Sequence, residues 1–189
     1  MEKQVALAPA AGPHLPPERG LKRMKKPIVK GTLLFHPTHG LCRVALILGT
    51  AASKEVSYSL LPVARNSAKV RFIVPQSSLE NSGFSKLISA KEANAILEYF
   101  KTGAKKDSEC SPTWTLAVVI WSESCSKESA KDTRRRQRVE RSVKGLAGEL
   151  AVVLKINLKE ITEKIQKNLG NVSTINPLVL TALANVDRD

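Results

Sequence analysis

The sequence predicts an α+β protein in which a small five-stranded barrel is followed by a compact C-terminal helical domain. Three observations lead to this expectation. Short apolar segments fill residues 30–88, two helix-capping signals come after them, and a long amphipathic segment rich in Lys and Arg lies between residues 127 and 153. With 189 residues, of which 42% are hydrophobic, the chain is long enough to bury a core.

The barrel is expected to begin with a hairpin. Short apolar runs flank Pro37-Thr38-His39-Gly40, whose proline and glycine suit a tight turn. A long curved strand over 41–48 should follow, and the segments 56–60 and 70–74 show the two-residue period of half-buried strands. A short strand over 84–88 brings the number to five, which is typical of a small Tudor-like or SH3-like barrel.

Helix signals come after the barrel. The capping box Ser89-Ala90-Lys91-Glu92 opens a helix that we expect to end at Gly103, and a second capping box at 157–160 opens a final helix that stops near Gly170. Residues 104–112 are polar and have no period, so we place a domain boundary there. The predicted organisation is a flexible basic arm (1–29), the barrel with its trailing helix (30–103), a basic helical domain (104–170) and a tail of unclear order (171–189).

Charge and cysteine content restrict the class of function. Thirty Lys and Arg against 17 Asp and Glu give a net charge of +13, which favours phosphate-rich or otherwise acidic partners; a merely soluble basic protein is the alternative. The three cysteines match no disulfide framework, so we expect the protein to reside in a reducing cytoplasm. The N-terminal residues do not form a secretory signal, and the longest strongly apolar run, 116–121, is too short for a membrane span.

The segment 127–144 is the strongest candidate for contact with an acidic partner. Its Lys and Arg residues greatly outnumber its acidic ones, while apolar residues recur at spacings of three and four. Arginines at this density repel one another unless an anion neutralises them, and DNA phosphate suits the guanidinium group. A solvated amphipathic face without a ligand is the alternative. The residues expected to contact DNA are Arg134, Arg135, Arg138, Arg141 and Lys144.

Two tryptophans lead to different expectations. Trp121 ends an apolar run and is expected to be a core residue. Trp114 follows Ser111-Pro112-Thr113 at the entrance of the helical domain, where we expect its ring to remain partly exposed. An exposed ring at this position is suited to stacking on, or wedging against, a base pair at a minor groove.

The residues do not point to catalysis. His36, His39 and Cys42 have a spacing that could form part of a metal site, but no Cys or His cluster completes the ligand set. The chain also has no phosphate-binding glycine-rich loop and no Gly-x-Ser-x-Gly motif. We therefore expect a protein that is not an enzyme and that binds neither a metal nor a cofactor.

Taken together, these features resemble the CarD/CdnL/TRCF family of bacterial transcription factors. The resemblance covers about residues 30–167 and rests on the hairpin 36–40, the strand end Val74-Pro75, the capped helix and the Trp before a basic helical region. It implies that an exposed strand edge of the barrel, with Lys69, Arg71 and Ile73, pairs with the β subunit of RNA polymerase. It also implies that Trp114 contacts promoter DNA at the upstream edge of the transcription bubble.

The expected function is therefore that of a cytoplasmic, nucleoid-associated transcription regulator. It would dock on polymerase through the barrel, contact promoter DNA largely independently of sequence, and modulate the formation of the open complex. The alternative is a Tudor-like module that binds RNA or a ribosome and does not contact polymerase.

Overall fold

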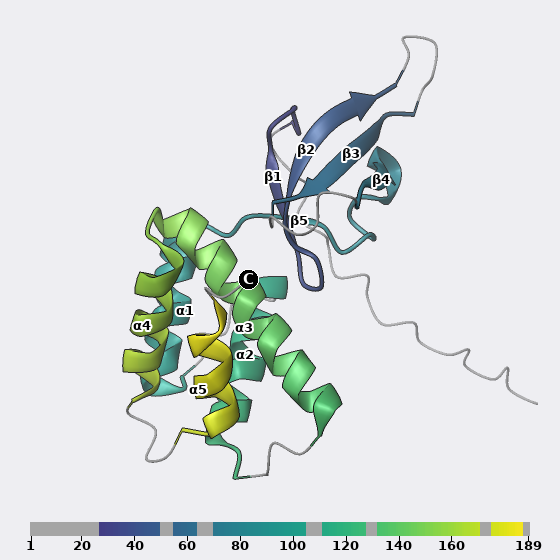
Figure 1. Cartoon of the computed structure of the whole chain (residues 1–189). Coiled ribbons are helices and arrows are strands. Elements are labelled where there is room, and N and C mark those ends of the chain that lie inside the picture. Colours follow the sequence, from purple (N-terminus) through teal and green to yellow (C-terminus); the bar gives the residue numbers. More distant parts are fainter. Residues whose placement is uncertain are drawn as a thin grey trace, which may run out of the picture.

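The computed structural model describes residues 27–49, 55–63, 70–104, 111–127, 132–170 and 175–186. Most of the predicted arm (1–26), Lys69 and the outer parts of the predicted tail (171–174 and 187–189) therefore lie outside the described residues. Within the described ranges, a five-stranded antiparallel sheet curled into a half-barrel is followed by five helices, which confirms the mixed α+β class. Figure 1 shows the sheet standing beside the helices, with the tip of the β1–β2 hairpin directed toward them.

The strands of the sheet are antiparallel and lie in the order β4-β3-β2-β1-β5. A register shift between Val44 and Leu46 marks a bulge in the long strand β2, and bulges of this kind bend a strand. A short 3-10 turn, η2 (Gln76–Ser78), follows β4. The strands are β1 (Leu33–His36), β2 (Gly40–Leu48), β3 (Ser57–Pro62), β4 (Phe72–Pro75) and β5 (Ser85–Lys86).

The concave side of the sheet encloses a small core of its own. Side chains alternate between the two faces of β2: Val44 is fully buried, as is its cross-strand partner Leu60, whereas the neighbouring Arg43 is exposed. Burial also raises the pKa of the Cys42 thiol to about 11, so this cysteine is an apolar core residue in practice. The buried members of this core are Leu34, Cys42, Val44, Tyr58, Leu60, Val74, Leu79 and Phe84.

Capping residues set the starts of the helices, and both predicted capping positions are confirmed. The side chains of Ser89 and Asn157 accept hydrogen bonds from the backbone N–H groups of Glu92 (3.1 Å) and Glu160 (2.7 Å). The first helix ends, as predicted, at Gly103, which has a positive φ of 67°. The helices are α1 (Ala90–Thr102), α2 (Pro112–Cys125), α3 (Thr133–Leu154), α4 (Leu158–Leu169) and α5 (Pro177–Ala184).

Helix α5 occupies part of the segment in which we recognised no organising signal. Asn176 accepts a hydrogen bond from the backbone N–H of Leu178 at 2.9 Å, and Pro177 stands at the first helical position. Leu178, Val179, Ala182 and Leu183 of α5 are all buried in the helical core. The pair Asn176-Pro177 before an apolar run is the sequence signal for this helix.

The sheet and the helices are joined by buried contacts, and α1 packs with the other helices. Phe35 of β1 belongs to the helical core and lies over Gly145 of α3, where a Cβ atom would be 3.7 Å from the Phe35 ring. The carboxylate of Glu149, also on α3, is fully buried and accepts hydrogen bonds from the backbone N–H of Ile88 (3.0 Å) and the hydroxyl of Thr113 (2.7 Å). These contacts fix the sheet to the middle of α3.

Candidate nucleic-acid interface

One side of α3 is basic and exposed. At about 100° per residue, four Lys and Arg residues fall within roughly a third of the helix circumference. The other side of the helix carries Val139, Val143, Leu146 and Leu150, which are fully buried. We call the exposed set the α3 basic face: Arg134, Arg138, Arg141 and Lys144.

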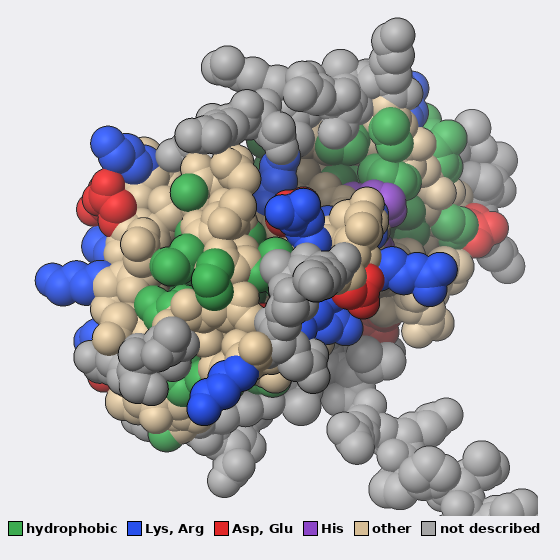
Figure 2. Space-filling model, turned by 60° about the horizontal axis from the view of Figure 1, so that its bottom comes forward, with side chains coloured by type: hydrophobic (Ala, Val, Ile, Leu, Met, Phe, Trp, Pro, Cys, Tyr) green, Lys and Arg blue, Asp and Glu red, His purple; other side chains and the backbone are tan. Residues whose placement is uncertain are grey.

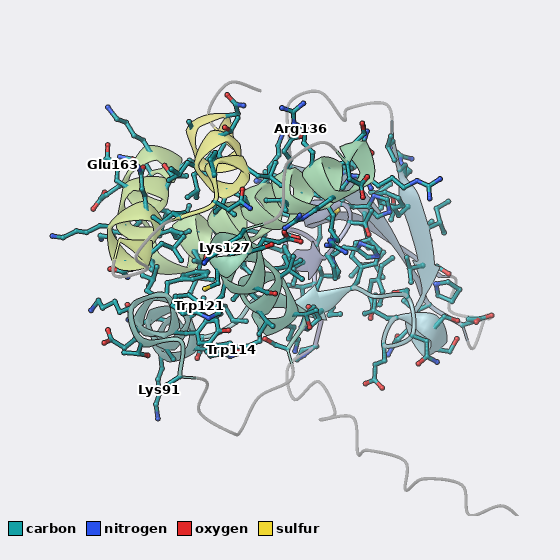
Figure 3. All side chains as sticks on the ribbon, turned by 90° about the horizontal axis from the view of Figure 1, so that it is seen from below. Lys91, Trp114, Trp121, Lys127, Arg136 and Glu163 are labelled. Carbon is teal, nitrogen blue, oxygen red and sulfur yellow. The ribbon has the colours of Figure 1, made fainter. Side chains whose placement is uncertain are left out.

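The wider surface around the helices is also rich in positive charge. Figure 2 shows Lys and Arg side chains in the middle of one face of the molecule, between the helical part and the sheet, with a few acidic side chains among them. Arg136 of α3 lies outside the basic face, on the far side of the helix from it, and is labelled in Figure 3. Its guanidinium forms a long ion pair of 3.9 Å with Glu140, and both side chains are exposed. Such a pair contributes little to stability.

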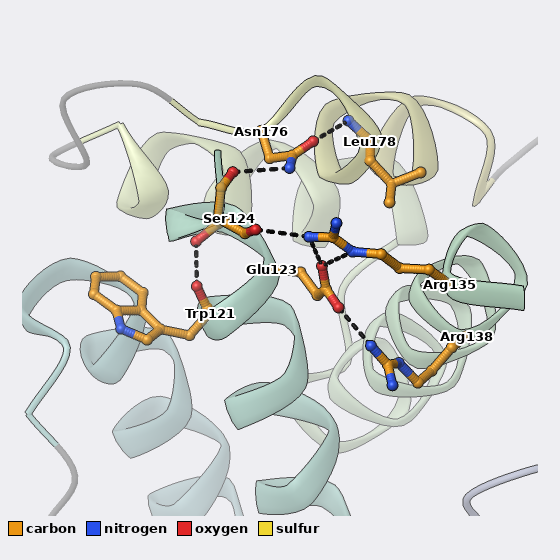
Figure 4. Close-up of polar contacts among 8 residues, drawn as sticks. Trp121, Glu123, Ser124, Arg135, Arg138, Asn176 and Leu178 are labelled. Carbon is orange, nitrogen blue, oxygen red and sulfur yellow. Dashed lines mark hydrogen bonds and ion pairs between the residues drawn. The ribbon is translucent and has the colours of Figure 1, made fainter. Parts of the chain in front are cut away.

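Arg135 does not belong to the exposed face, contrary to the sequence-based expectation. Its side chain is only 10% exposed, and its Nε donates a hydrogen bond to Glu123 Oε2 at 2.6 Å. A second nitrogen, Nη2, donates to the hydroxyl of Ser126 at 2.8 Å. The reason is the helical period, because a residue next to Arg134 points about 100° away from it, here toward α2. Figure 4 shows Glu123 between the two arginines that it pairs with, Arg135 and Arg138.

Glu123 of α2 is the acidic centre of this network, and the sequence analysis missed it. Arg138 Nη2 donates to Glu123 Oε1 at 2.7 Å, so each carboxylate oxygen accepts from a different arginine. Burial by itself would raise the pKa of Glu123, but the hydrogen bonds and charges of Arg135 and Arg138 outweigh it and hold the pKa below its ordinary value. A single acidic residue near the end of an apolar helix, ahead of an arginine cluster, is the signal that points to this pairing.

An open cavity lies beside the network, between the last turns of α2 and the first turns of α3. Its volume is about 570 Å³. Arg134, Arg135 and Arg138 line it together with Glu123, Asp132 and two serines of α2 and its end. The Asp132 carboxylate caps α3 by accepting a hydrogen bond from the backbone N–H of Arg134 at 2.8 Å.

Trp114 is buried, so the expectation that its ring remains partly exposed is wrong. The side chain is 5% exposed, and its ring lies edge-on to Tyr99 of α1, with 5.5 Å between the ring centroids. Trp121 is partly buried and packs against the same core, with its ring centroid also 5.5 Å from that of Tyr99. Figure 3 shows both tryptophans in the interior of the helical part. Trp114 is enclosed because α1, the preceding helix, packs over the first turn of α2.

Of the residues expected to contact a protein, Ile73 lies on β4, an edge strand of the sheet, whereas Lys69 lies outside the described residues. Arg71 is exposed just before the strand, and Ile73 within it is 61% exposed. Ile73 pairs with Ser59, which in turn pairs with Leu46 of β2, and the Leu46 side chain is 43% exposed. Exposed apolar side chains thus lie on β4 itself and on β2, two strands in from this edge, and we call this region, with the neighbouring arginine, the β4 edge surface: Arg71, Ile73 and Leu46.

The two histidines of the hairpin belong to an aromatic cluster. His36 Nδ1 accepts hydrogen bonds from the backbone N–H groups of Thr38 (3.1 Å) and His39 (3.3 Å), and its ring lies 4.6 Å from that of His39. The His39 ring lies 4.5 Å from Phe72. Burial, with a contribution from His39, lowers the pKa of His36. In the described part of the chain no three potential ligands come together as a metal site, and the histidines hold the hairpin tip against β4.

Neither a protein-family model nor a curated protein matches this sequence at a significant level. Across the described ranges, no helix has both the length and the apolar character needed to cross a bilayer.

Proposed function

We propose that this protein is a bacterial transcription regulator of the CarD type. The half-barrel is then a Tudor-like module that binds the β subunit of RNA polymerase through the β4 edge surface, and the α3 basic face contacts promoter DNA. The observation that carries the proposal is the α3 basic face itself, a set of exposed cations on a helix whose opposite side packs into the core through Val139, Val143, Leu146 and Leu150. Arg138 already pairs with Glu123, and the like charges gathered on this helix side favour a further anionic partner.

The DNA contact in this proposal is made to phosphates. Arg134, Arg138 and Arg141 project from an exposed helix side, and Arg pairs well with phosphate oxygens. Phosphate contacts fix position and carry no sequence information, so binding is expected to be largely independent of sequence. Because Trp114 is buried, it takes no part in this contact, and the effect on promoter opening comes from holding DNA next to the polymerase.

The protein contact is made by strand pairing. β4 forms one edge of the sheet, and an edge strand offers backbone N–H and C=O groups to a strand of a partner. The exposed side chain of Ile73 adds apolar contact area beside that edge. Phe35 and Glu149 fix the sheet to α3, so the two surfaces keep a constant relative position. A factor of this kind shifts the closed-to-open promoter equilibrium by binding one state more tightly.

The salt dependence of duplex binding tests the proposal. Removal of one phosphate-binding side chain lowers the slope of log K against log salt by about 0.9, so the triple variant Arg134→Gln/Arg138→Gln/Arg141→Gln should bind more weakly and reduce the slope by about 2 to 3. Arg136→Gln is the control, because Arg136 lies off the basic face. Fluorescence anisotropy with unrelated duplexes measures both quantities.

The same titrations identify the outcomes that count against the proposal. An unchanged slope in the triple variant would show that the α3 basic face only keeps the surface solvated. Preferential binding of single-stranded RNA over duplex DNA would favour the alternative of an RNA- or ribosome-binding module.

A further inference from the structure

The cavity between α2 and α3 is lined by a buried carboxylate that pairs with two arginines, a feature that a merely solvated surface does not need. Glu123 is buried, with a side chain 9% exposed, yet it holds two arginines, one through each carboxylate oxygen. Arg135 is pulled inward, whereas the Arg138 side chain is 62% exposed and stands at the cavity wall. Burying a carboxylate is costly unless it is paired, so the network fixes both guanidinium groups in place.

Arg138 keeps most of its hydrogen-bonding capacity. A guanidinium has five N–H groups, and Arg138 uses one nitrogen, Nη2, to donate to Glu123. Arg134 lies one helical turn earlier on the same side of α3, is exposed, and lines the same cavity. The two side chains therefore present two guanidinium groups to the same cavity, and that of Arg138 is already oriented by Glu123.

The charges around the cavity favour an anion. Three arginines face two carboxylates, which leaves one net positive charge. Both carboxylates are engaged: Glu123 pairs with Arg135 and Arg138, and Asp132 caps α3. The donors that remain are those of Arg134 and Arg138, together with the exposed hydroxyl of Ser122. A phosphate oxyanion matches planar guanidinium donors, and an oriented fork loses less conformational entropy on binding.

We propose that this cavity is a phosphate-binding pocket, in which Arg134 and Arg138 contact the phosphate and Glu123 and Arg135 act as positioning residues. The inference deepens the proposed DNA contact. It rests on that proposal where the bound phosphate belongs to the DNA backbone. The cavity is open and larger than one phosphate group, so it admits either a phosphate of the DNA backbone or a small phosphorylated ligand.

Inorganic phosphate is the probe, compared with chloride at equal pH and ionic strength. At ten times its dissociation constant, phosphate should raise the melting temperature of the wild-type chain by about 3 to 5 °C. Arg136→Gln, whose side chain lies outside the cavity, should respond equally. The double variant Arg134→Gln/Arg138→Gln should respond by less than about 1 °C. Both replaced side chains are exposed and Glu123 keeps Arg135, so the double variant is expected to fold.

Arg138→Lys separates a specific pocket from general electrostatics. It keeps the charge and removes the planar fork, so the response to phosphate should fall although the net charge is unchanged. Equal responses of the wild type, Arg138→Lys and the double variant would overturn the proposal.

Competition with duplex DNA then identifies the source of the phosphate. Displacement of duplex by inorganic phosphate beyond the effect of matched chloride, abolished in the double variant, supports a phosphate of the DNA backbone. A phosphate response without such displacement supports a small phosphorylated ligand in the same pocket. Should the wild-type chain bind no duplex, the proposed function fails, while the melting data still decide for or against the pocket.

Discussion

Replacement of Trp114 by Ala distinguishes a core residue from a DNA-contacting one. The side chain is 5% exposed and lies edge-on to Tyr99. Truncation of a buried Trp costs about 3 to 5 kcal/mol, of which an aromatic pair accounts for about 0.5 to 1.5 kcal/mol. For a chain of this size, 1 kcal/mol corresponds to about 2 to 4 °C, so the melting temperature should fall by about 6 to 20 °C.

The assay is thermal unfolding followed by circular dichroism, with urea unfolding at 25 °C as a second measure. Trp121→Ala is the matched comparison: Trp121 contacts the same Tyr99 ring but is only partly buried, so its removal should cost less. Duplex binding by folded Trp114→Ala at low temperature should equal that of the wild type. A variant with unchanged stability and weakened DNA binding would refute this reasoning and restore an exposed, nucleic-acid-contacting Trp114.

Two further sets of variants test the packing. Burial raises the pKa of Glu149, so ionisation of this carboxyl opposes folding as the pH rises above the ordinary pKa of 4.5. The unfolding free energy of the wild type minus that of Glu149→Gln should therefore decrease from pH 4 to pH 7. An increase would contradict the buried position of Glu149. Gly103→Ala should lose more than about 1 kcal/mol, because φ is positive and the new Cβ would lie 2.6 Å from the Trp121 ring. Gly148→Ala, with open space around the new Cβ atom, should instead gain about 0.5 to 1 kcal/mol of unfolding free energy. Equal urea midpoints for the two variants would contradict the positions of these two glycines.

Local signals in the sequence were sufficient for the starts of α1 and α4 and for the strand pattern. Ser89 and Asn157 cap their helices through partners only three residues away, so the capping chemistry is visible in the sequence. The hairpin at Gly40 is local in the same sense, because the turn residues and both strands are contiguous. The half-barrel follows from such local elements, although its curvature comes from pairing between strands.

The candidate site depended on contacts between successive helices, whose packing the sequence does not show. Trp114 is buried because Tyr99 of another helix covers it. Arg135 turns inward because Glu123, 12 residues earlier and on a different helix, accepts its hydrogen bond. A run of arginines therefore predicts a basic surface but not which of its members face solvent, and that division depends on the neighbouring helix.

Recovery of RNA polymerase from a bacterial lysate tests the central claim most directly. The immobilised wild-type chain and its Ile73→Asp variant are compared after nuclease treatment, which removes DNA that could bridge the two proteins. Ile73 is 61% exposed on the edge strand β4, so the variant should fold normally and keep its duplex binding while placing a charge beside the pairing edge. We expect the wild type to recover the β subunit and the variant to recover at least tenfold less, corresponding to a reduction in affinity of about 1.4 kcal/mol. Equal recovery by both chains, or recovery of ribosomal proteins without polymerase, would contradict the account.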